Sequence, residues 1–204
     1  MTNEGSISEM FNLDFIIKIK EYLEKKLDSE RYEHTLGVSF TAAALAMKYG
    51  MDVYTAEIAG LLHDCGKQDS GKKLIEKCRK EKVELSEDTL MSPSVVHGKY
   101  GAYLARKQFG IEDPDIINSI SYHTTGRPEM SMLEKIIFIA DYIEPMRSEE
   151  ELENLRYVRS EAFSDLDHTM AVILHDNLEY LRSQQDKYIH RDTLDAFDYY
   201  KRYL

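Results

Sequence analysis

The chain has 204 residues, of which 43% are hydrophobic and 31% charged, and its formal net charge is −11 at pH 7. This length fits one domain, or one domain with a short appended lobe, and the hydrophobic fraction suffices for an ordinary buried core. An acidic surface repels polyanions and argues against general binding of DNA or RNA. A small phosphorylated substrate is still compatible, provided that the site carries its own cations.

The sequence predicts a cytoplasmic protein without membrane association. No apolar run reaches the length of a membrane-spanning helix, and the densest runs, at 58–62 and 136–140, have the length of core segments. The N-terminus, MTNEGSISEM, lacks the charged and apolar regions of a secretory signal. The two cysteines are too few for a secreted disulfide framework, which agrees with a reducing compartment.

Helix signals recur along the chain, whereas strand-like alternation is scarce. The start signals are N-cap residues, one N-cap followed by proline, and two capping boxes at Ser131 and Ser148. Gly50 and Gly110 are expected helix ends. We therefore predict an all-α bundle of roughly nine or ten helices and no sheet, with start signals at Asn12, Ser29, Asp52, Ser94, Asp113, Ser131, Ser148, Ser164 and Asp192.

Four of the seven histidines, together with two aspartates, fall in or beside these predicted helices. Because they come from separate helices, the helices must converge if these residues form one site. Neutral imidazole and carboxylate suit iron, manganese or zinc. Six such groups suit two metals that share a bridging carboxylate, as in hydrolases of phosphate esters or anhydrides. In chain order the candidates are His34, His63, Asp64, His97, His123 and Asp141.

The other histidines have a simpler interpretation. A second doublet, His175-Asp176, lies in a strongly periodic helix without companion ligands, and we interpret it and His168 as helix surface or packing. His190 is interpreted as structural. Asp141 differs, because it lies inside an apolar helix, where an unpaired buried carboxylate is costly and a metal or cation partner is expected.

Glycines close to the candidate histidines are a further feature. Gly37, Gly98 and Gly101 lie inside predicted helices, where glycine costs about 1 kcal/mol relative to alanine. Close backbone approach around a crowded metal centre explains this cost, and so does ordinary tight helix packing. The sequence leaves both explanations open.

Segments around the candidate ligands share their sequence with a known family. They read RYEHT at 31–35, LHDCGK at 62–67, HGKYGA at 97–102, YHTTG at 122–126 and ADYIEPMR at 140–147. Together they resemble the HD-domain metal-dependent phosphohydrolases, and more specifically the YqeK group. The resemblance implies a symmetrical bis(5'-nucleosyl)-tetraphosphatase that cuts diadenosine tetraphosphate into two ADP. We expect one HD-type domain over 1–204, with a metal-site core at about 29–147 and C-terminal helices at about 148–204 packed on it.

The resemblance also implies a role for each candidate ligand. A water between two divalent cations has a lowered pKa, so hydroxide would be available near neutral pH to attack an inner phosphorus. Iron is our first choice of metal and manganese the second. One ion would be held by His34, His63, Asp64 and Asp141, and the other by His97 and His123 with Asp64 bridging.

The anionic substrate requires cations and hydrogen-bond donors. Lys67 follows Asp64 by three residues and could act as a point charge, so these two are the predicted catalytic residues. A short hydroxyl-bearing loop could cradle a phosphate, and an arginine could bind one bidentately. Glu144 is expected to support a ligand from behind. The predicted substrate contacts are Lys67, Thr124, Thr125, Gly126, Arg127 and Arg147, and Lys99 and Arg31 are weaker candidates.

Other functions stay open. A nucleotidase of the same superfamily could hold identical metals and differ only in its pocket. The cyclic-dinucleotide branch is disfavoured, because it typically carries Gly-Tyr-Pro after a His-His-Glu run and Arg127 stands where the tyrosine would be. A catalytically silent nucleotide sensor would show a degenerate site, and no ligand of the pattern is missing here. The charged segment 149–159 could serve a partner or a homodimer contact.

Overall fold

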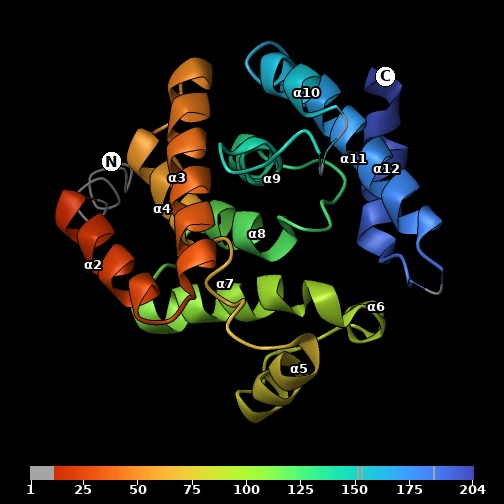
Figure 1. The fold of residues 1–204 in the computed structure, drawn as a ribbon. Helices are drawn as coiled ribbons and strands as arrows, with labels where there is room; N and C mark the ends of the chain where they lie inside the picture. The colour runs from red at the N-terminus through yellow and green to blue at the C-terminus, as the bar shows by residue number, and fades with distance from the viewer. Residues whose placement is uncertain (1–11, 151, 153, 186) are drawn as a thin grey trace, which may run out of the picture.

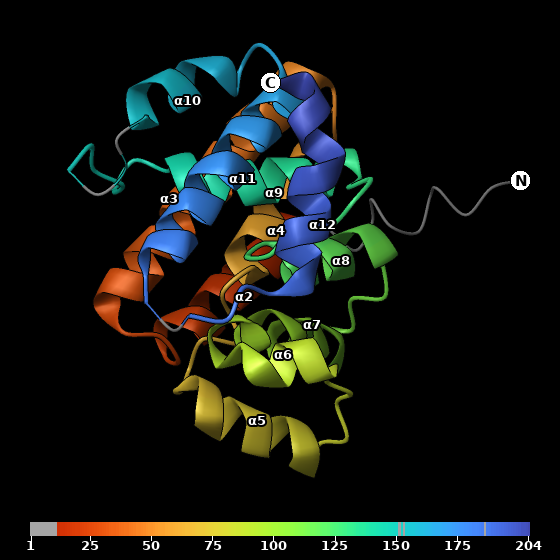
Figure 2. The ribbon, with the colours of Figure 1, turned by 90° about the vertical axis from the view of Figure 1, so that its right-hand side faces the viewer.

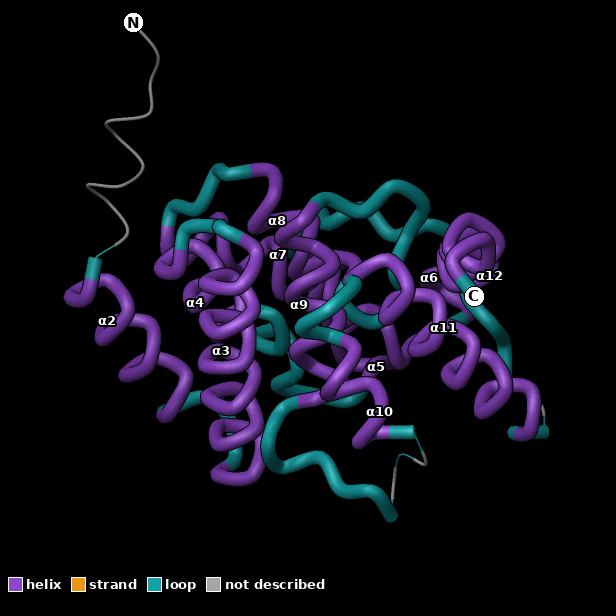
Figure 3. Tube along the Cα trace, turned by 90° about the horizontal axis from the view of Figure 1, so that it is seen from above, coloured by secondary structure: helices purple, strands orange, loops and turns teal. Residues whose placement is uncertain are grey.

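The computed structural model describes residues 12–150, 152, 154–185 and 187–204. Every regular element in these ranges is a helix, which confirms the predicted all-α fold class (Figures 1 and 3). The described residues form eleven α-helices, slightly more than predicted, because α5 and the short helix α6 were not among the predicted helix starts. They are α2 (Leu13–Glu24), α3 (Ser29–Tyr49), α4 (Val53–Leu62), α5 (Gly71–Lys80), α6 (Glu87–Met91), α7 (Val96–Phe109), α8 (Pro114–Tyr122), α9 (Met132–Ile143), α10 (Leu155–Glu161), α11 (Leu166–Ser183) and α12 (Arg191–Tyr200), with 3-10 turns at Pro93–Val95 and Lys201–Tyr203.

Local capping explains most helix boundaries. Except at α5, α7 and α10, the N-cap side chain accepts a hydrogen bond from a backbone N–H in the first turn, and Ser131 and Glu134 form a complete capping box at α9. Gly50 and Gly110 end α3 and α7 in the left-handed conformation, at φ 71° and 67°, as predicted. The other capping side chains predicted correctly are Asn12 for α2, Asp52 for α4 and Asp113 for α8.

The helix predicted to start at Ser148 is a correction. Helix α10 starts only at Leu155, and Glu151, the last residue of the predicted capping box, lies outside the described residues. Arg159 of α10 explains the difference, because its guanidinium binds back to the chain that leaves α9 and holds that chain in a loop. The acceptors are the carbonyl oxygens of Ile143, Glu144 and Arg147, at 2.9, 2.8 and 3.0 Å.

Helix α9 is the centre of the fold. It packs against α3, α4 and α8 on one side and against α11 on the other, and α12 covers α11 (Figures 1 and 2). Residues 136–140 of α9 are all buried, as the apolar run predicts. Helix α7 lies across α8, and α5 packs on α7. No described helix has the length and apolar character needed to span a membrane.

Glycine permits a close helix contact beside the candidate ligands. A Cβ atom at Gly98 of α7 would lie only 2.9 Å from the carbonyl oxygen of Ser121 on α8. The backbones of α7 and α8 therefore approach closely, next to His97 and His123. At this glycine, tight helix packing and proximity of two candidate ligands are the same feature.

Candidate metal centre

All six predicted ligands converge between α3, α4, α7, α8 and α9. Asp64 lies in the middle, with Oδ1 facing His97 and His123 and Oδ2 facing His63. Asp141 extends the cluster on the other side of His63. The separations are 3.3 Å from Asp64 Oδ1 to His97 Nε2, 3.4 Å to His123 Nε2, 3.7 Å from Asp64 Oδ2 to His63 Nε2, and 3.9 and 3.1 Å from Asp141 Oδ1 to the Nε2 atoms of His63 and His34.

Helix ends aim most of these side chains. His63 and His123 are the C-cap residues of α4 and α8, and His97 is the second residue of α7. His34 and Asp141 project from within α3 and α9, which pack side by side. The fold therefore builds the cluster where several helices start or end around the buried α9.

Backbone carbonyls fix the orientation of three imidazoles. The Nδ1 atoms of His63, His97 and His123 lie 2.7, 2.7 and 2.8 Å from the carbonyl oxygens three residues earlier. Such a carbonyl accepts a hydrogen bond from a protonated Nδ1, which leaves a lone pair on Nε2 of the neutral ring. All three Nε2 lone pairs consequently point into the cluster.

Several of the atoms that point into the cluster are hydrogen-bond acceptors without a donor. The Nε2 atoms of His97 and His123 face each other at 3.0 Å. His63 Nε2 and Asp64 Oδ1 are buried without a hydrogen-bond partner, and so is His34 Nε2, although it lies near Asp141. Buried acceptors that face one another are costly unless a cation joins them. Two groups could hold an ion, His34 with His63 and Asp141, and His63 with Asp64 and His123, since their donor atoms lie within 4.8 Å of one another.

Burial and mutual charge set the protonation states in the form that metals require. Burial lowers the pKa of His63 to about 4 and that of His97 to about 3, so both rings are neutral at pH 7. Burial alone would raise the pKa values of Asp64 and Asp141, but the neighbouring histidines hold both below the usual range. The aspartates are therefore ionised acceptors, like the neutral imidazoles beside them.

His34 has a different environment. Its Nδ1 lies 3.0 Å from Oε1 of the buried Glu144, whose other oxygen accepts a 2.7 Å hydrogen bond from the backbone N–H of Met146. Burial opposes protonation of His34, but the nearby carboxylates of Asp141 and Glu144 outweigh it and raise the pKa of His34. Glu144 reaches the ring because Gly37 has no side chain; a Cβ there would lie 2.4 Å from Glu144 Oε2 and displace it. The carboxylate–imidazole pair is the support expected behind a metal ligand.

Three cationic side chains rim the cluster. Arg31 lies 2.9 Å and Lys67 3.6 Å from Asp64 Oδ2, and Arg147 lies 2.8 Å from Asp141 Oδ1. All three are partly exposed, so they are accessible to an anionic ligand. Lys67 and Arg147 were predicted at the site. The structure brings Arg31 there too, although it was one of the weaker candidates.

The predicted phosphate loop divides into two parts. The hydroxyl of Thr124 lies 3.1 and 3.0 Å from the Nε2 atoms of His97 and His123, at the cluster. The rest of the loop is directed elsewhere. Arg127 forms a bidentate pair with the buried Glu134, at 2.7 and 2.6 Å, and Gly126 faces Ala196 of α12. Thr125 is buried and donates to the carbonyl of Gly126.

The weaker candidate Lys99 is also directed away from the cluster. It lies over the Tyr122 ring, 3.6 Å from its centroid, and burial lowers its pKa to about 8. The histidines outside the pattern have structural contacts. His190 is the N-cap of α12, His168 is bonded to Tyr157, and the side chain of His175 is 50% exposed on α11.

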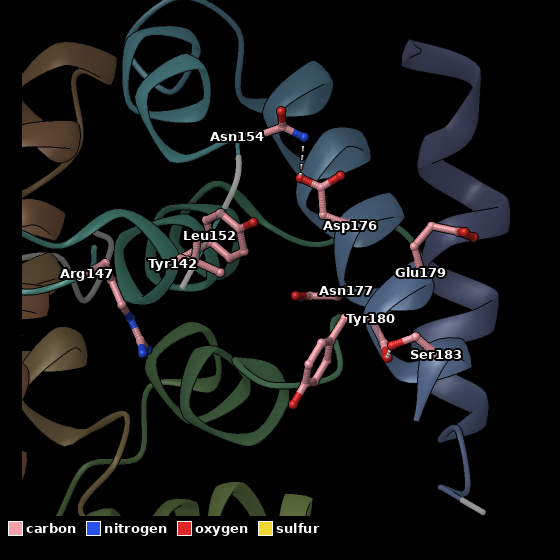
Figure 4. Close-up of a pocket in the computed structure, with 9 residues that line it drawn as sticks. All are labelled: Tyr142, Arg147, Leu152, Asn154, Asp176, Asn177, Glu179, Tyr180 and Ser183. Carbon is pink, nitrogen blue, oxygen red and sulfur yellow. Dashed lines mark hydrogen bonds between the residues drawn. The ribbon is translucent and has the colours of Figure 1, made fainter. Parts of the chain in front are cut away.

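Cavities open on two sides of the cluster. A 360 Å³ cavity beside Lys67 and a 220 Å³ cavity beside Tyr142 both reach His123 and Asp141. The second adjoins a larger cavity of 660 Å³ on α11, which we call the α11 chamber (Figure 4). Its lining includes Tyr142, Arg147, Asp176, Asn177 and Tyr180. Sequence reasoning missed the α11 residues, whose only signal is a polar stripe on a periodic helix.

Comparisons with known proteins agree with this geometry. The family model described as HD domain matches residues 31–146. The chain is 38% identical over 181 residues to the symmetrical bis(5'-nucleosyl)-tetraphosphatase of Halalkalibacterium halodurans, covering 89% of this chain and 94% of the relative. It is 38% identical over 186 residues to the enzyme of the same name from Staphylococcus aureus, covering 91% and 94%.

A solved structure gives the same result for the fold. A crystal structure described as a predicted HD superfamily hydrolase involved in NAD metabolism, from Clostridium acetobutylicum, matches with a TM-score of 0.85 and 40% sequence identity. The match covers 91% of this chain and 96% of that one. The family model spans more than half of the chain, and the relatives are matched over nearly their whole length. The chain therefore belongs to the HD domain family and, within it, to the group of the symmetrical bis(5'-nucleosyl)-tetraphosphatases.

Proposed function

We propose that this protein hydrolyses diadenosine tetraphosphate symmetrically into two molecules of ADP. The observation that carries the proposal is the convergence of buried, proton-free imidazole nitrogens and carboxylate oxygens on one point, with cations at the rim. The names of the relatives supply the substrate, and the charge arrangement suits a polyphosphate.

The donor set fits two divalent cations, with iron as first choice and manganese as second. His34, His63, Asp64 and Asp141 would hold one ion, and His97 and His123 the other, with Asp64 shared between them. When bound, such ions supply a water of lowered pKa as nucleophile and stabilise charge on the phosphoryl oxygens. The position of Asp64 supports its shared role, because its two oxygens face different histidines.

The rim residues would orient the tetraphosphate. Arg31, Lys67 and Arg147 now pair with the two aspartates, and metal binding would satisfy those carboxylates instead. The released guanidinium and ammonium groups could then bind phosphate oxygens, the arginines bidentately. The hydroxyl of Thr124 is a further donor at the cluster. For Thr125, Gly126 and Arg127, the observed contacts favour a structural role over substrate contact.

Cavities on both sides of the cluster support a substrate with two ends. Symmetrical cleavage requires attack on an inner phosphorus, so two nucleoside ends must extend away from the metals. The cavity beside Lys67 and the cavity beside Tyr142 leave the cluster in different directions. A nucleotidase needs space for only one nucleoside.

Product analysis tests the proposal. Protein reconstituted anaerobically with ferrous iron, and separately with manganese, is given diadenosine tetraphosphate, with Asp64→Ala as control. We expect ADP as the sole nucleotide product and no turnover by the variant. Formation of AMP and ATP would retain a hydrolase but exclude symmetrical cleavage. No turnover despite bound metal would indicate a nucleotidase or a nucleotide sensor, to be separated with a panel of nucleotides.

A further inference from the structure

The α11 chamber has no role in the chemistry described so far. We propose that it binds one adenosine end of the substrate and that Asn177 and Tyr180 of α11 determine the preference for the base. The inference rests on the proposed function and deepens it, because it specifies where one nucleoside lies.

The chamber is connected to the cluster. Its lining shares Tyr142, Arg147 and Asn177 with the 220 Å³ cavity, which is also lined by His123 and Asp141. A ligand whose phosphates lie at the cluster can therefore extend along α11 without leaving the cavity. The chamber itself measures 660 Å³, within the size range of small-molecule sites.

The charges along this path are arranged to suit a nucleotide, with a cation at the phosphate end and carboxylates at the nucleoside end. Arg147, at the cluster end, is the one cationic side chain among the described residues that line the chamber. Asp176 and Glu179 line the α11 part, where a phosphate would be repelled. Carboxylates there would instead accept hydrogen bonds from ribose hydroxyls or from an exocyclic amine. The phosphates are thus placed towards the cluster and the nucleoside towards α11.

Helix α11 presents its recognition groups on a rigid face. Asn177 and Tyr180 are three residues apart and project from α11 towards the side on which Tyr142 and Arg147 lie (Figure 4). On the core side of the same helix, Leu174 and Leu178 are buried and fix its position. A site on a packed helix holds its groups more accurately than a loop does.

Asn177 and Tyr180 suit the two parts of base recognition, which are hydrogen bonding to the edge of the base and stacking on its face. The Asn177 amide has no hydrogen-bond partner among the described residues, and an amide can pair with the N6 and N7 edge of adenine. Tyr180 is 58% exposed although it is a large aromatic residue. Lys187 lies over the Tyr180 ring at 5.1 Å, so a base would stack on the opposite face or displace the lysine.

Variants of the metal-loaded protein test the chamber with three ligands: ADP, inorganic tripolyphosphate and diadenosine tetraphosphate. For Asn177→Ala and Tyr180→Ala, we expect the Kd for ADP and the KM for the substrate to rise about 10-fold, the loss of one base contact. The Kd for tripolyphosphate and the kcat should stay unchanged, because the cluster is intact. A uracil base lacks the edge that an amide pairs with in adenine. Asn177→Ala should therefore also narrow the difference between the KM for diadenosine tetraphosphate and the KM for diuridine tetraphosphate.

Tyr54→Ala is the matched control, since Tyr54 is also an exposed tyrosine, at 46%, and lies on α4 away from the chamber. It should leave all three affinities unchanged. The proposed role of the chamber would be refuted by unchanged ADP affinity in both α11 variants, or by an equal loss of affinity for tripolyphosphate. Hydrolysis of diadenosine tetraphosphate by the wild type would still support the proposed function in that case. Conversely, ADP binding that depends on Asn177, without hydrolysis of diadenosine tetraphosphate by the wild type, would support the chamber and refute that function.

Discussion

The chain contains the dipeptide His-Asp twice, in surroundings that differ completely. His63-Asp64 ends α4, both side chains are buried, and four further candidate ligands from other helices lie around them. His175-Asp176 lies within α11, where the His175 side chain is half exposed and Asp176 accepts a hydrogen bond from Asn154. The comparison shows that the dipeptide by itself does not make a cluster of candidate metal ligands.

Backbone geometry explains much of the difference. Neighbouring residues of a continuing helix point about 100° apart, so they rarely face the same small ligand. After His63 the helix stops, and the chain turns so that Asp64 Oδ2 lies 3.7 Å from His63 Nε2. Burial then removes competing water, which makes the unpaired acceptors strong ligands.

Alanine at the two histidines gives the largest contrast between the doublets. We expect His63→Ala to lose bound metal and to lower kcat/KM by at least about 10³-fold, because a group on which the chemistry depends is gone. His175→Ala should keep both properties within about twofold, as expected for a surface change. Metal content by elemental analysis and kcat/KM for diadenosine tetraphosphate check this. Equal losses in the two variants would mean that the doublets are not different in function.

Neutralising Glu144, the carboxylate behind His34, should have the next largest effect. Glu144→Gln keeps the shape of the side chain but weakens the hydrogen bond that orients His34. We expect metal affinity to fall about 10–100-fold, the usual effect of such a partner. Glu134→Gln is the matched control on the same helix, because Glu134 is equally buried but pairs with Arg127. It should lower Tm and leave metal affinity unchanged. Competition with a chelator dye measures the affinities, and unchanged affinity for Glu144→Gln would contradict the assigned role.

The helices and the ligand pattern were predictable because their signals are local. The periodic apolar run of α9, the N-caps and the C-terminal glycines each depend on a few neighbouring residues. The six candidate ligands could be found as an ordered set because helices seldom carry so many histidines and aspartates without a common purpose. Their division between two ions depended on the resemblance to a known family.

What the sequence did not predict depends on contacts between distant residues. Ser148 has a good capping pattern, but Arg159 binds the preceding carbonyls and keeps that segment in a loop. Arg127 was expected at a phosphate, yet Glu134 stands seven residues further on and pairs with it. The α11 chamber depends on how α11 packs beside α9, which no local pattern encodes.

A methyl group at Gly37 should lower metal affinity in the same way as Glu144→Gln, but by less. The added Cβ would lie 2.4 Å from Glu144 Oε2, so the carboxylate must move from His34. For Gly37→Ala we expect metal affinity to fall about 10-fold and stability to fall by about 1–3 kcal/mol. In the double variant with Glu144→Gln, the loss of affinity should be no greater than with Glu144→Gln alone, because both act on one contact. Additive losses of affinity would show that Gly37 acts through some other contact.

The last prediction concerns how the stability of the metal-free protein responds to pH. His63 and His97 stay neutral in the folded state until the pH approaches their lowered pKa values of about 4 and 3. The unfolded chain already binds these protons near its ordinary pKa of about 6.5. The unfolded state therefore holds more protons, and the free energy of unfolding should fall as the pH drops from about 6.5 to 4, by on the order of 1 kcal/mol per pH unit for each histidine.

His34 cannot mask this fall, because its raised pKa alters stability only as the pH rises above about 6.5. The two aspartates, with lowered pKa values, lose their contribution only at more acidic pH and act in the same direction. Urea unfolding of the metal-free protein at pH 6.0 and 5.0 measures the slope. His63→Gln should reduce it, since glutamine binds no proton, whereas His175→Gln should not. An unchanged slope in His63→Gln would mean that this ring is not the neutral, proton-free group that a metal ion requires, and the contrast between the two doublets would then rest on position alone.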